Sequence, residues 1–468
     1  MKRREFLFLA ASSVGLAGQS GASDLVDIAV LTDMAKRRAG PTPAPINCLA
    51  PAGSEDNLNA VVAAWRKATG IPVTLDIVDV DDINNRMTID HLARRAAYDV
   101  ALPATFGVAD LAWSGVVQPM SPIETGLGAP SYDSLGTFDL GNVLGGRRYG
   151  CQTDGDVYLM FYRRDWLDHP ERQAAYGDAT GEALGQPKTW TELDRQIAFF
   201  NRPERGEYGG ALFRTPAYAV WEFWSRMHAN GVAPFDDDLT PMIAEEGAVD
   251  ALQAMIRTST SLHPSARTAG LFENWRQFEA GQIYCNIGWG GSQKFFNRPV
   301  SRIRGKLAFA SPPGGRAASM SYFNWGWSYV IPANSPKPDI AFLFSAFATS
   351  PEISTLAVRE AGGYFDPFLD EHYEDPQIRE AYSAAFLQVH QRAMQDPLPD
   401  LYLPGHGSYF ASLAGWIERV ALGEVSASEG LRRAALDWRV ISLDFDEVKQ
   451  TERWREIYRN YPAYFRRG

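Results

Sequence analysis

The sequence predicts an α/β protein made of two lobes, and three observations carry this prediction. At 468 residues the chain exceeds the size at which a single hydrophobic core stops growing. Its hydrophobic content of 45% and charged content of 22% are ordinary for a folded protein. Strand-like blocks also recur after long helical stretches, so we expect the chain to visit each lobe more than once.

The first elements predict a parallel sheet. Residues 46–49 form a short apolar strand, and a second strand follows Gly70 over residues 71–77. Between the strands, four apolar residues repeat at helical spacing: Leu58, Val61, Val62 and Trp65. A strand, a helix and a strand within about 35 residues are typical of a βαβ unit, which implies parallel strands. The Pro-rich residues 40–45 before this unit predict an extended leader.

Later segments continue the pattern. Residues 98–102 form a third strand with a helix beginning near residue 109, and residues 156–162 form a continuous apolar and aromatic run. Such a run is typical of a strand buried on both faces. Further strands are predicted at 283–287, 307–310 and 328–331, and helices at 189–200, 216–230, 244–260 and over much of the chain after 339.

The N-terminus has the pattern of an export signal. Arg3 and Arg4 precede an apolar run over residues 6–18, and small residues follow at 20–23. This order predicts a Tat-type signal peptide over residues 1–23 and a mature protein in the periplasm. The run is shorter than the ~20 apolar residues that span a bilayer. No cysteine directly follows it, so a lipid anchor is not expected.

The formal charge of −11 argues against nucleic acid as a partner, because phosphates require a Lys/Arg surface. It disfavours an anionic substrate more weakly. Cys48, Cys151 and Cys285 are too few and too widely spaced to predict a disulfide framework, and we expect all three to be buried, inert thiols.

Familiar catalytic motifs are missing from the sequence. It contains no nucleophile elbow, no zinc-binding His pair on a helix, no phosphate-binding P-loop and no C-x-x-C. We therefore expect neither a catalytic residue nor a metal or cofactor. The best enzymatic alternative is a secreted glycosidase using Asp154 and Asp156. Two acids at i and i+2 of a strand are ~6.5 Å apart but project from one wall, which suits gripping hydroxyls better than cleavage.

Several segments together resemble a known family. They are residues 149–165 (YGCQTDGDVYLMFYRRD), 187–193 (PKTWTEL), 278–289 (ending in Gly-Trp), 327–335 (WSYVIPANS) and 403–435. In this order they are similar to the extracellular solute-binding proteins of ABC importers, in the carbohydrate-binding, maltose-binding-protein-like branch (family 1). Each segment is short, and their order and spacing carry the resemblance.

The resemblance implies a type II periplasmic-binding fold, with two α/β lobes, a hinge of two or three crossings and a ligand cleft between the lobes. Projected onto this chain, one lobe covers residues 44–152 plus 311–362 and the other 153–310 plus 363–468. The implied function is to bind a sugar, oligosaccharide or polyol and deliver it, as a monomer, to the permease subunits of an ABC importer. A solute sensor that docks to a receptor shares this fold and stays an alternative.

The implied ligand site begins where the chain first crosses between lobes. A neutral sugar presents hydroxyls at its edge and a C–H face on its ring, and proteins hold these with carboxylates, amides and aromatic planes. Asp154 and Asp156 lie at the crossing, with Gln152 beside them. In the alternative interpretation, one Asp caps a turn at Gly155 and the other pairs with Arg163 or Arg164.

Aromatic candidates follow from the same resemblance. Trp289 and Trp327 match positions that stack on sugar in the family, and Trp325 is a nearby candidate. Glycines follow Trp289, which lets a ligand approach the backbone closely. Core packing is the alternative for all three. Trp221 and Trp224 are expected to pack in the core, with a position lining the second lobe as the alternative, and His406 is expected to be a loop histidine.

The remaining candidates are Ser54, Glu55, Thr105 and Tyr364. Ser54 and Glu55, in the first βα loop, would offer a hydroxyl, a carboxylate and helix amides to the cleft, or would simply cap the helix. Several family members carry an acid after the third strand, where this chain has Pro-Ala-Thr-Phe over residues 103–106. Thr105 is the candidate replacement, and Tyr364 lies near the last crossing.

Overall fold

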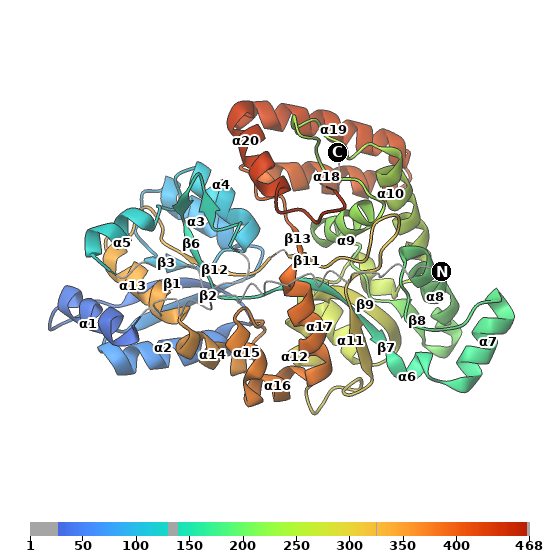
Figure 1. The fold of residues 1–468 in the computed structure, drawn as a ribbon, viewed down its shortest axis with the longest axis horizontal. Coiled ribbons are helices and arrows are strands. Elements are labelled where there is room, and N and C mark those ends of the chain that lie inside the picture. The colour runs from blue at the N-terminus through green and yellow to red at the C-terminus, as the bar shows by residue number, and fades with distance from the viewer. Residues whose placement is uncertain (1–26, 130–138, 324, 466–468) are drawn as a thin grey trace, which may run out of the picture.

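The computed structural model describes residues 27–129, 139–323 and 325–465, and it contains two large mixed sheets (Figure 1). The predicted signal peptide, residues 1–23, lies outside the described residues. In strand order, the first sheet consists of β2 (Val73–Val78), β1 (Ile46–Pro51), β3 (Val100–Ala101), β12 (Ser328–Val330) and β6 (Gly150–Gln152). We call this sheet and the helices around it the first lobe.

The predicted βαβ unit is confirmed. β1 pairs in parallel with β2 and with β3, and α2 (Glu55–Thr69) connects β1 to β2. Leu58, Val61 and Trp65 form the buried face of α2, and Gly70 ends the helix in the left-handed conformation. The other helices of this lobe are α3 (Ile83–Leu92), α4 (Val108–Trp113), α5 (Ser121–Leu127), α13 (Pro338–Ala348) and α14 (Pro351–Arg359).

One further helix of the first lobe was not predicted. α1 (Ile28–Ala39) packs against α13 and α2, with Leu31 and Ala35 buried. The Asp27 side chain caps its first turn by accepting a hydrogen bond from the Ala29 amide at 2.8 Å. The expected extended leader is therefore limited to residues 40–45, after the helix.

The second sheet forms the centre of the second lobe. Its strand order is β13 (Leu398–Pro399), β11 (Tyr322–Phe323), β7 (Val157–Arg163), β9 (Ile283–Trp289) and β8 (Tyr208–Gly210), and β10 (Leu307–Ala310) also pairs with β7. Every residue of β7 is buried, which confirms the predicted strand with two covered faces. β11 lies beyond residue 311 but pairs in this sheet, so the precise lobe boundaries stay predictions.

Helices cover the second sheet on both sides (Figure 1). The helices of the second lobe are α6 (Arg164–Leu167), α7 (Pro170–Thr180), α8 (Trp190–Phe200), α9 (Pro216–Ala229), α10 (Glu246–Thr258), α11 (Leu271–Glu279), α12 (Ser292–Phe296), α15 (Asp370–Glu374), α16 (Pro376–Tyr382), α17 (Ala384–Gln395), α18 (His406–Ala421), α19 (Ala427–Asp444) and α20 (Glu447–Tyr458). A two-stranded ribbon, β4 (Val143–Leu144) and β5 (Arg147–Arg148), precedes β6.

The chain crosses between the sheets in three places: between β6 and β7, between β11 and β12, and after α14, over residues 360–369. These crossings contact one another. The Thr153 amide donates to the Trp327 carbonyl at 2.9 Å, and the Asp366 amide donates to Asp154 Oδ1 at 2.6 Å. Three adjoining crossings agree with the predicted hinge.

Among the described helices, none is by itself long and apolar enough to cross a membrane. α13 and α14 pass that test only as a pair, and they are bent by 69° at their junction. The three cysteines are buried, as predicted. Burial raises the pKa of the Cys48 and Cys285 thiols.

Candidate functional site

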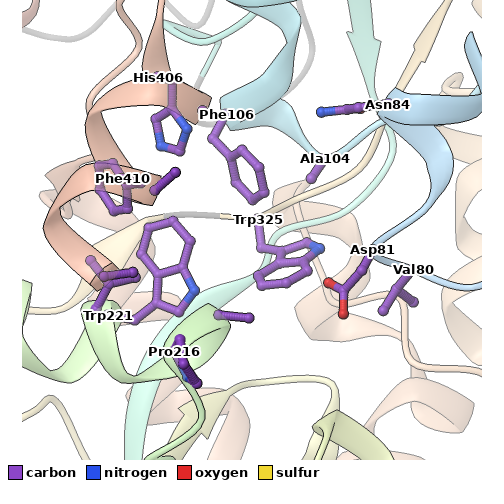
Figure 2. Close-up of a pocket in the computed structure, with 15 residues that line it drawn as sticks. Val80, Asp81, Asn84, Ala104, Phe106, Pro216, Trp221, Trp325, His406 and Phe410 are labelled. Carbon is purple, nitrogen blue, oxygen red and sulfur yellow. The ribbon is translucent and has the colours of Figure 1, made fainter. Parts of the chain in front are cut away.

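A cavity of about 240 Å³ lies between the two lobes (Figure 2). From the first lobe it is lined by the loop after β2, by α3 and by the segment after β3; from the second lobe it is lined by α9 and α18. Trp325 reaches it from the crossing between β11 and β12. Because both lobes and a crossing supply its walls, the shape of this aromatic pocket depends on how the lobes are held together.

Five of the fifteen residues that line the aromatic pocket carry aromatic rings, and these rings lie close together (Figure 2). The Phe106 ring stacks on the His406 ring with centroids 4.8 Å apart, and His406 stacks on Phe410 at 4.2 Å. Trp221 packs against Phe410 at 4.7 Å, and Phe106 meets the Trp325 ring edge-to-face at 5.3 Å. Flat aromatic faces of this kind suit the C–H face of a sugar ring or the carbon chain of a polyol.

The polar groups of the aromatic pocket include acceptors and donors. Asp81 accepts a hydrogen bond from the Tyr218 hydroxyl of the other lobe at 3.1 Å, and burial raises the pKa of the Asp81 carboxyl. The indole N–H groups of Trp221 and Trp325 and the Asn84 Oδ1 atom are buried without a hydrogen-bond partner among the described residues. A hydroxyl group both donates and accepts, so it can satisfy both kinds of group.

Trp325 has an unusual backbone conformation. Its φ is +67°, in the left-handed region that a bulky residue occupies at a cost of ~1–3 kcal/mol. Thr105 secures the next residue, because its amide donates to the Gly326 carbonyl at 2.7 Å and its hydroxyl donates to the same carbonyl. Thr105 is 1% exposed. The hydroxyl that we expected to contact a ligand thus instead fixes the backbone beside Trp325.

The acidic side chains predicted for the site lie in the crossings and do not line the aromatic pocket. Asp154 Oδ1 accepts the Asp366 amide, and Asp156 Oδ1 accepts the Gly290 amide at 3.1 Å. Gln152 Nε2 donates to the carbonyl of Asp154 at 2.9 Å. All four of Gln152, Asp154, Asp156 and Asp366 are buried.

Neither predicted acid pairs with the arginines that were the alternative. Arg163 forms a salt bridge with Asp165 at 2.6 Å, and Arg164 donates to the Gly305 carbonyl at 3.3 Å. The alternative arginine pairing is therefore wrong.

Asp154, Asp156, Asp366 and Lys294 form a buried charged cluster that we call the acidic crossing. Burial raises the pKa of Asp366 to about 6, and burial together with the neighbouring carboxyls raises the pKa values of Asp154 and Asp156. Burial lowers the pKa of Lys294 to about 8, and its ammonium donates to the Glu360 carbonyl at 2.9 Å. The carboxyl groups of the acidic crossing therefore keep their protons to a higher pH than exposed carboxyl groups do.

Trp289 and Trp327 are almost fully buried and do not line the aromatic pocket. The Trp289 ring meets Trp325 edge-to-face at 5.0 Å and Tyr158 at 5.2 Å, so it supports Trp325 from the second sheet. The Trp327 ring lies 6.3 Å from that of Tyr364. Of the predicted side chains, Trp325 lines the aromatic pocket.

The remaining predicted residues stand at the first βα loop and the last crossing. Ser54 occupies the N-cap position of α2, but its hydroxyl donates to the Pro51 carbonyl at 2.6 Å instead of capping the helix. Glu55 is the first residue of α2 and is partly exposed. Tyr364 is buried, and burial raises the pKa of its phenol, an effect that the neighbouring Ser54 hydroxyl partly offsets.

Sequence reasoning missed most of the cavity wall. Trp221 was expected in the core, with the lining of the second lobe as the alternative, and His406 was expected in a loop; both line the aromatic pocket, and His406 is the first residue of α18. Asp81 and Asn84 could have been predicted from their position after a strand. They follow the carboxyl end of β2, and ligands of α/β sheets commonly bind at that edge.

The described residues contain no group of three or more His, Cys, Asp or Glu side chains arranged to hold a metal ion. The three aspartates of the acidic crossing are thus a hydrogen-bonded cluster without metal-site geometry.

Comparisons with known proteins give a consistent result. The profile of the bacterial extracellular solute-binding protein family matches residues 52–354. A mannitol-binding protein from Pseudomonas aeruginosa is 24% identical over 292 residues, which cover 61% of this chain. The match spans 64% of that relative, somewhat less than two thirds of its length.

Solved structures show the same architecture. Maltose-bound MalE3 from T. maritima superposes with a TM-score of 0.72 at 17% identity, covering 85% of this chain and 99% of that one. An ABC transporter solute-binding protein from Agrobacterium vitis with bound D-mannitol gives 0.70 at 17% identity, covering 86% and 99%. At such identities the likeness concerns the fold alone, and it confirms the predicted type II periplasmic-binding architecture.

Proposed function

The chain belongs to the bacterial extracellular solute-binding protein family, and we propose that it binds a small sugar or polyol between its lobes and delivers it to the permease of an ABC importer. Proteins of this family are components of transport systems and are not enzymes. Relatives and structural neighbours named for mannitol or solved with maltose and D-mannitol support this solute class.

The observation that carries the proposal is the composition of the aromatic pocket. It combines flat rings with the carboxylate of Asp81 and the two unpartnered indole N–H groups of Trp221 and Trp325. The hydroxyls of a solute donate to the Asp81 carboxylate and accept from the indole N–H groups, while the aromatic rings cover the apolar face of the solute. Such a solute touches both lobes only when they are together, so its binding favours the closed form.

The volume and the charge of the aromatic pocket narrow the class of solute further. A cavity of about 240 Å³ is below the ~300–1,000 Å³ typical of drug-sized ligands, so we propose a solute of monosaccharide size over a long oligosaccharide. Its lining contains Asp81 but neither Lys nor Arg. A negatively charged solute would therefore lack a counter-charge there.

The test is a thermal-shift screen across hexoses, hexitols, disaccharides and amino acids, followed by calorimetry. We expect one neutral hydroxylated solute to raise the melting temperature, because a ligand at 100 times its Kd stabilises the folded state by ~2.7 kcal/mol. Trp325→Ala should abolish that shift. Trp416→Ala, which removes a tryptophan of α18 outside the aromatic pocket, should preserve it. A response confined to amino acids or organic anions would refute the proposed solute class.

Two further measurements separate the alternatives. A glycosidase would convert a sugar during incubation, whereas we expect the solute to be recovered unchanged. A solute sensor would bind equally well, but it would not stimulate ATP hydrolysis by the reconstituted importer, and an importer's binding protein should.

We also propose export by the Tat route, on the basis of Arg3 and Arg4 ahead of the short apolar run. Replacing both with Lys should leave uncleaved precursor in the cytoplasm. Normal periplasmic accumulation of that variant would contradict the proposed route.

A further inference from the structure

We propose that Asp110 of the first lobe is a positioning residue that holds the start of α18 in the second lobe and so sets one wall of the aromatic pocket. The inference rests on the proposed function, because it concerns how that pocket is closed. It assigns the role to a carboxylate that does not itself line the cavity.

The carboxylate of Asp110 lies at the N-terminus of α18. Its Oδ1 atom accepts hydrogen bonds from the amides of Gly405 and His406, the latter at 3.0 Å, and its Oδ2 atom accepts the Gly407 amide at 2.9 Å. The first amides of a helix have no partner within the helix, and the positive end of its dipole favours an anion. Asp110 therefore meets both requirements of this terminus.

α18 has no side-chain cap of its own. Its N-cap residue is Gly405, with φ of +89°, and an added Cβ at that position would lie 2.8 Å from the ring of Phe445. Most side chains that cap a helix are thereby disfavoured at Gly405. The cap comes instead from α4, on the other lobe.

The cap is directly connected to the cavity wall. His406 and Gly407, whose amides Asp110 accepts, both line the aromatic pocket, and Phe410 follows one turn later. On the first lobe, Phe106 precedes Asp110 by four residues and stacks on the His406 ring. One short stretch of the first lobe therefore contacts α18 twice, once through a ring and once through a carboxylate.

These contacts depend on the position of the lobes. All three amides that the Asp110 carboxylate accepts belong to the second lobe. When the lobes separate, the carboxylate and the amides both return to water. Asp110 thus stabilises the closed arrangement selectively, and a contact shifts an equilibrium only by such a difference between states.

The experiment compares wild type, Asp110→Ala and Asp110→Asn. Cysteines introduced at the exposed Leu92 of α3 and Leu422 after α18 carry a fluorophore pair that reports the distance between lobes. Binding of D-mannitol is followed by calorimetry and by stopped-flow dissociation. Asp178→Ala, at an exposed carboxylate on α7, is the matched control.

We expect Asp110→Ala to shift the unliganded protein toward the wider separation, to weaken D-mannitol binding about tenfold and to accelerate its dissociation, with Asp110→Asn intermediate. A merely structural role would lower the melting temperature without changing the distance distribution. An unchanged distance and dissociation rate in Asp110→Ala would overturn the inference.

The two proposals fail separately. If wild type binds neither D-mannitol nor another sugar or polyol, but Asp110→Ala still widens the lobes, the solute class is wrong and the role of Asp110 stands. If wild type binds D-mannitol and Asp110→Ala matches it in affinity, dissociation and distance, the role of Asp110 is refuted and the solute class stands.

Discussion

The acidic crossing and the aromatic pocket are both made of buried side chains, but their polar groups differ in what they contact. In the acidic crossing, the Oδ1 atoms of Asp154 and Asp156 each accept an amide from another segment and Asp366 Oδ1 accepts the Tyr382 hydroxyl at 2.6 Å, while the Oδ2 atoms of Asp154 and Asp366 have no hydrogen-bond partner among the described residues. In the aromatic pocket, the indole N–H groups of Trp221 and Trp325 have no partner among the described residues. A buried polar group without a partner is costly, and of these two regions only the aromatic pocket places such groups on side chains that line a cavity, where a solute can supply the missing partner.

The largest expected effects come from two tryptophans that lie three residues apart on α9. Trp221 lines the aromatic pocket, whereas Trp224 is fully buried outside it. We expect Trp221→Ala to weaken solute binding at least 100-fold in calorimetry. Trp224→Ala should leave affinity nearly unchanged but lower the free energy of unfolding by ~4 kcal/mol, because it leaves a cavity. Equal affinity losses in the two variants would remove the distinction between pocket and core.

Gly155→Ala tests the closeness of the crossings. A Cβ at residue 155 would lie 1.9 Å from the Pro367 carbonyl oxygen, so one crossing must move away from the other. We expect the free energy of unfolding, measured with denaturant, to fall by ~3 kcal/mol. Gly185→Ala is the matched control, since nothing lies within 4 Å of its Cβ position. Similar stability of both variants would show that the crossings are loosely packed.

Asp366→Asn tests whether the acidic crossing holds protons. The pKa of Asp366 is raised to about 6, so its contribution to stability is present below the unfolded value near 3.9 and is lost as pH rises through 6. An Asn side chain does not titrate, so the Asp366→Asn variant does not lose this contribution as pH rises. We expect its stability relative to wild type to improve by ~2 kcal/mol between pH 4 and pH 7.

Denaturant unfolding at several pH values measures this difference. The buried His228 and His372 are present in both proteins, so their own titration cancels, whereas His390 Nε2 lies 3.8 Å from Asp366 Oδ2 and Asp154 and Asp156 also interact with Asp366, so the difference reports proton binding by the whole acidic crossing. A difference that does not vary with pH would mean that Asp366 is ionised throughout the range.

The smallest effect concerns the contact between the lobes at the rim of the aromatic pocket. Tyr218→Phe removes the hydroxyl that donates to Asp81 but keeps the ring, which stacks on Trp325 at 5.6 Å. We expect a roughly fivefold weaker affinity by calorimetry, since a hydrogen bond of this kind contributes ~1 kcal/mol. An unchanged affinity would show that this hydrogen bond does not help to close the lobes.

The sequence predicts the framework of the fold well, because local patterns determine it. The helical spacing of Leu58, Val61 and Trp65 identifies α2, and the unbroken apolar run of β7 identifies a strand with two covered faces. α1 was missed although Leu31 and Ala35 recur at helical spacing, because this short helix stands between the predicted export signal and the Pro-rich residues 40–45.

The site was predicted only in small part, for a physical reason. The aromatic pocket joins Asp81, Trp221, Trp325 and His406, which come from four distant segments of the chain. No local pattern shows that these segments meet. Asp154 and Trp289, by contrast, lie in the segments that carry the family resemblance, and the structure places them in the crossing and behind Trp325.

The burial of Cys48, Cys151 and Cys285 has a practical consequence. The thiolate is the nucleophile that attacks thiol reagents, and burial makes that form scarce at Cys48 and Cys285 and shields all three sulfur atoms. A single cysteine added at an exposed site can therefore be labelled selectively in the otherwise native chain. With an environment-sensitive dye near the mouth of the cleft, the protein would become a reagentless optical sensor for its own solute.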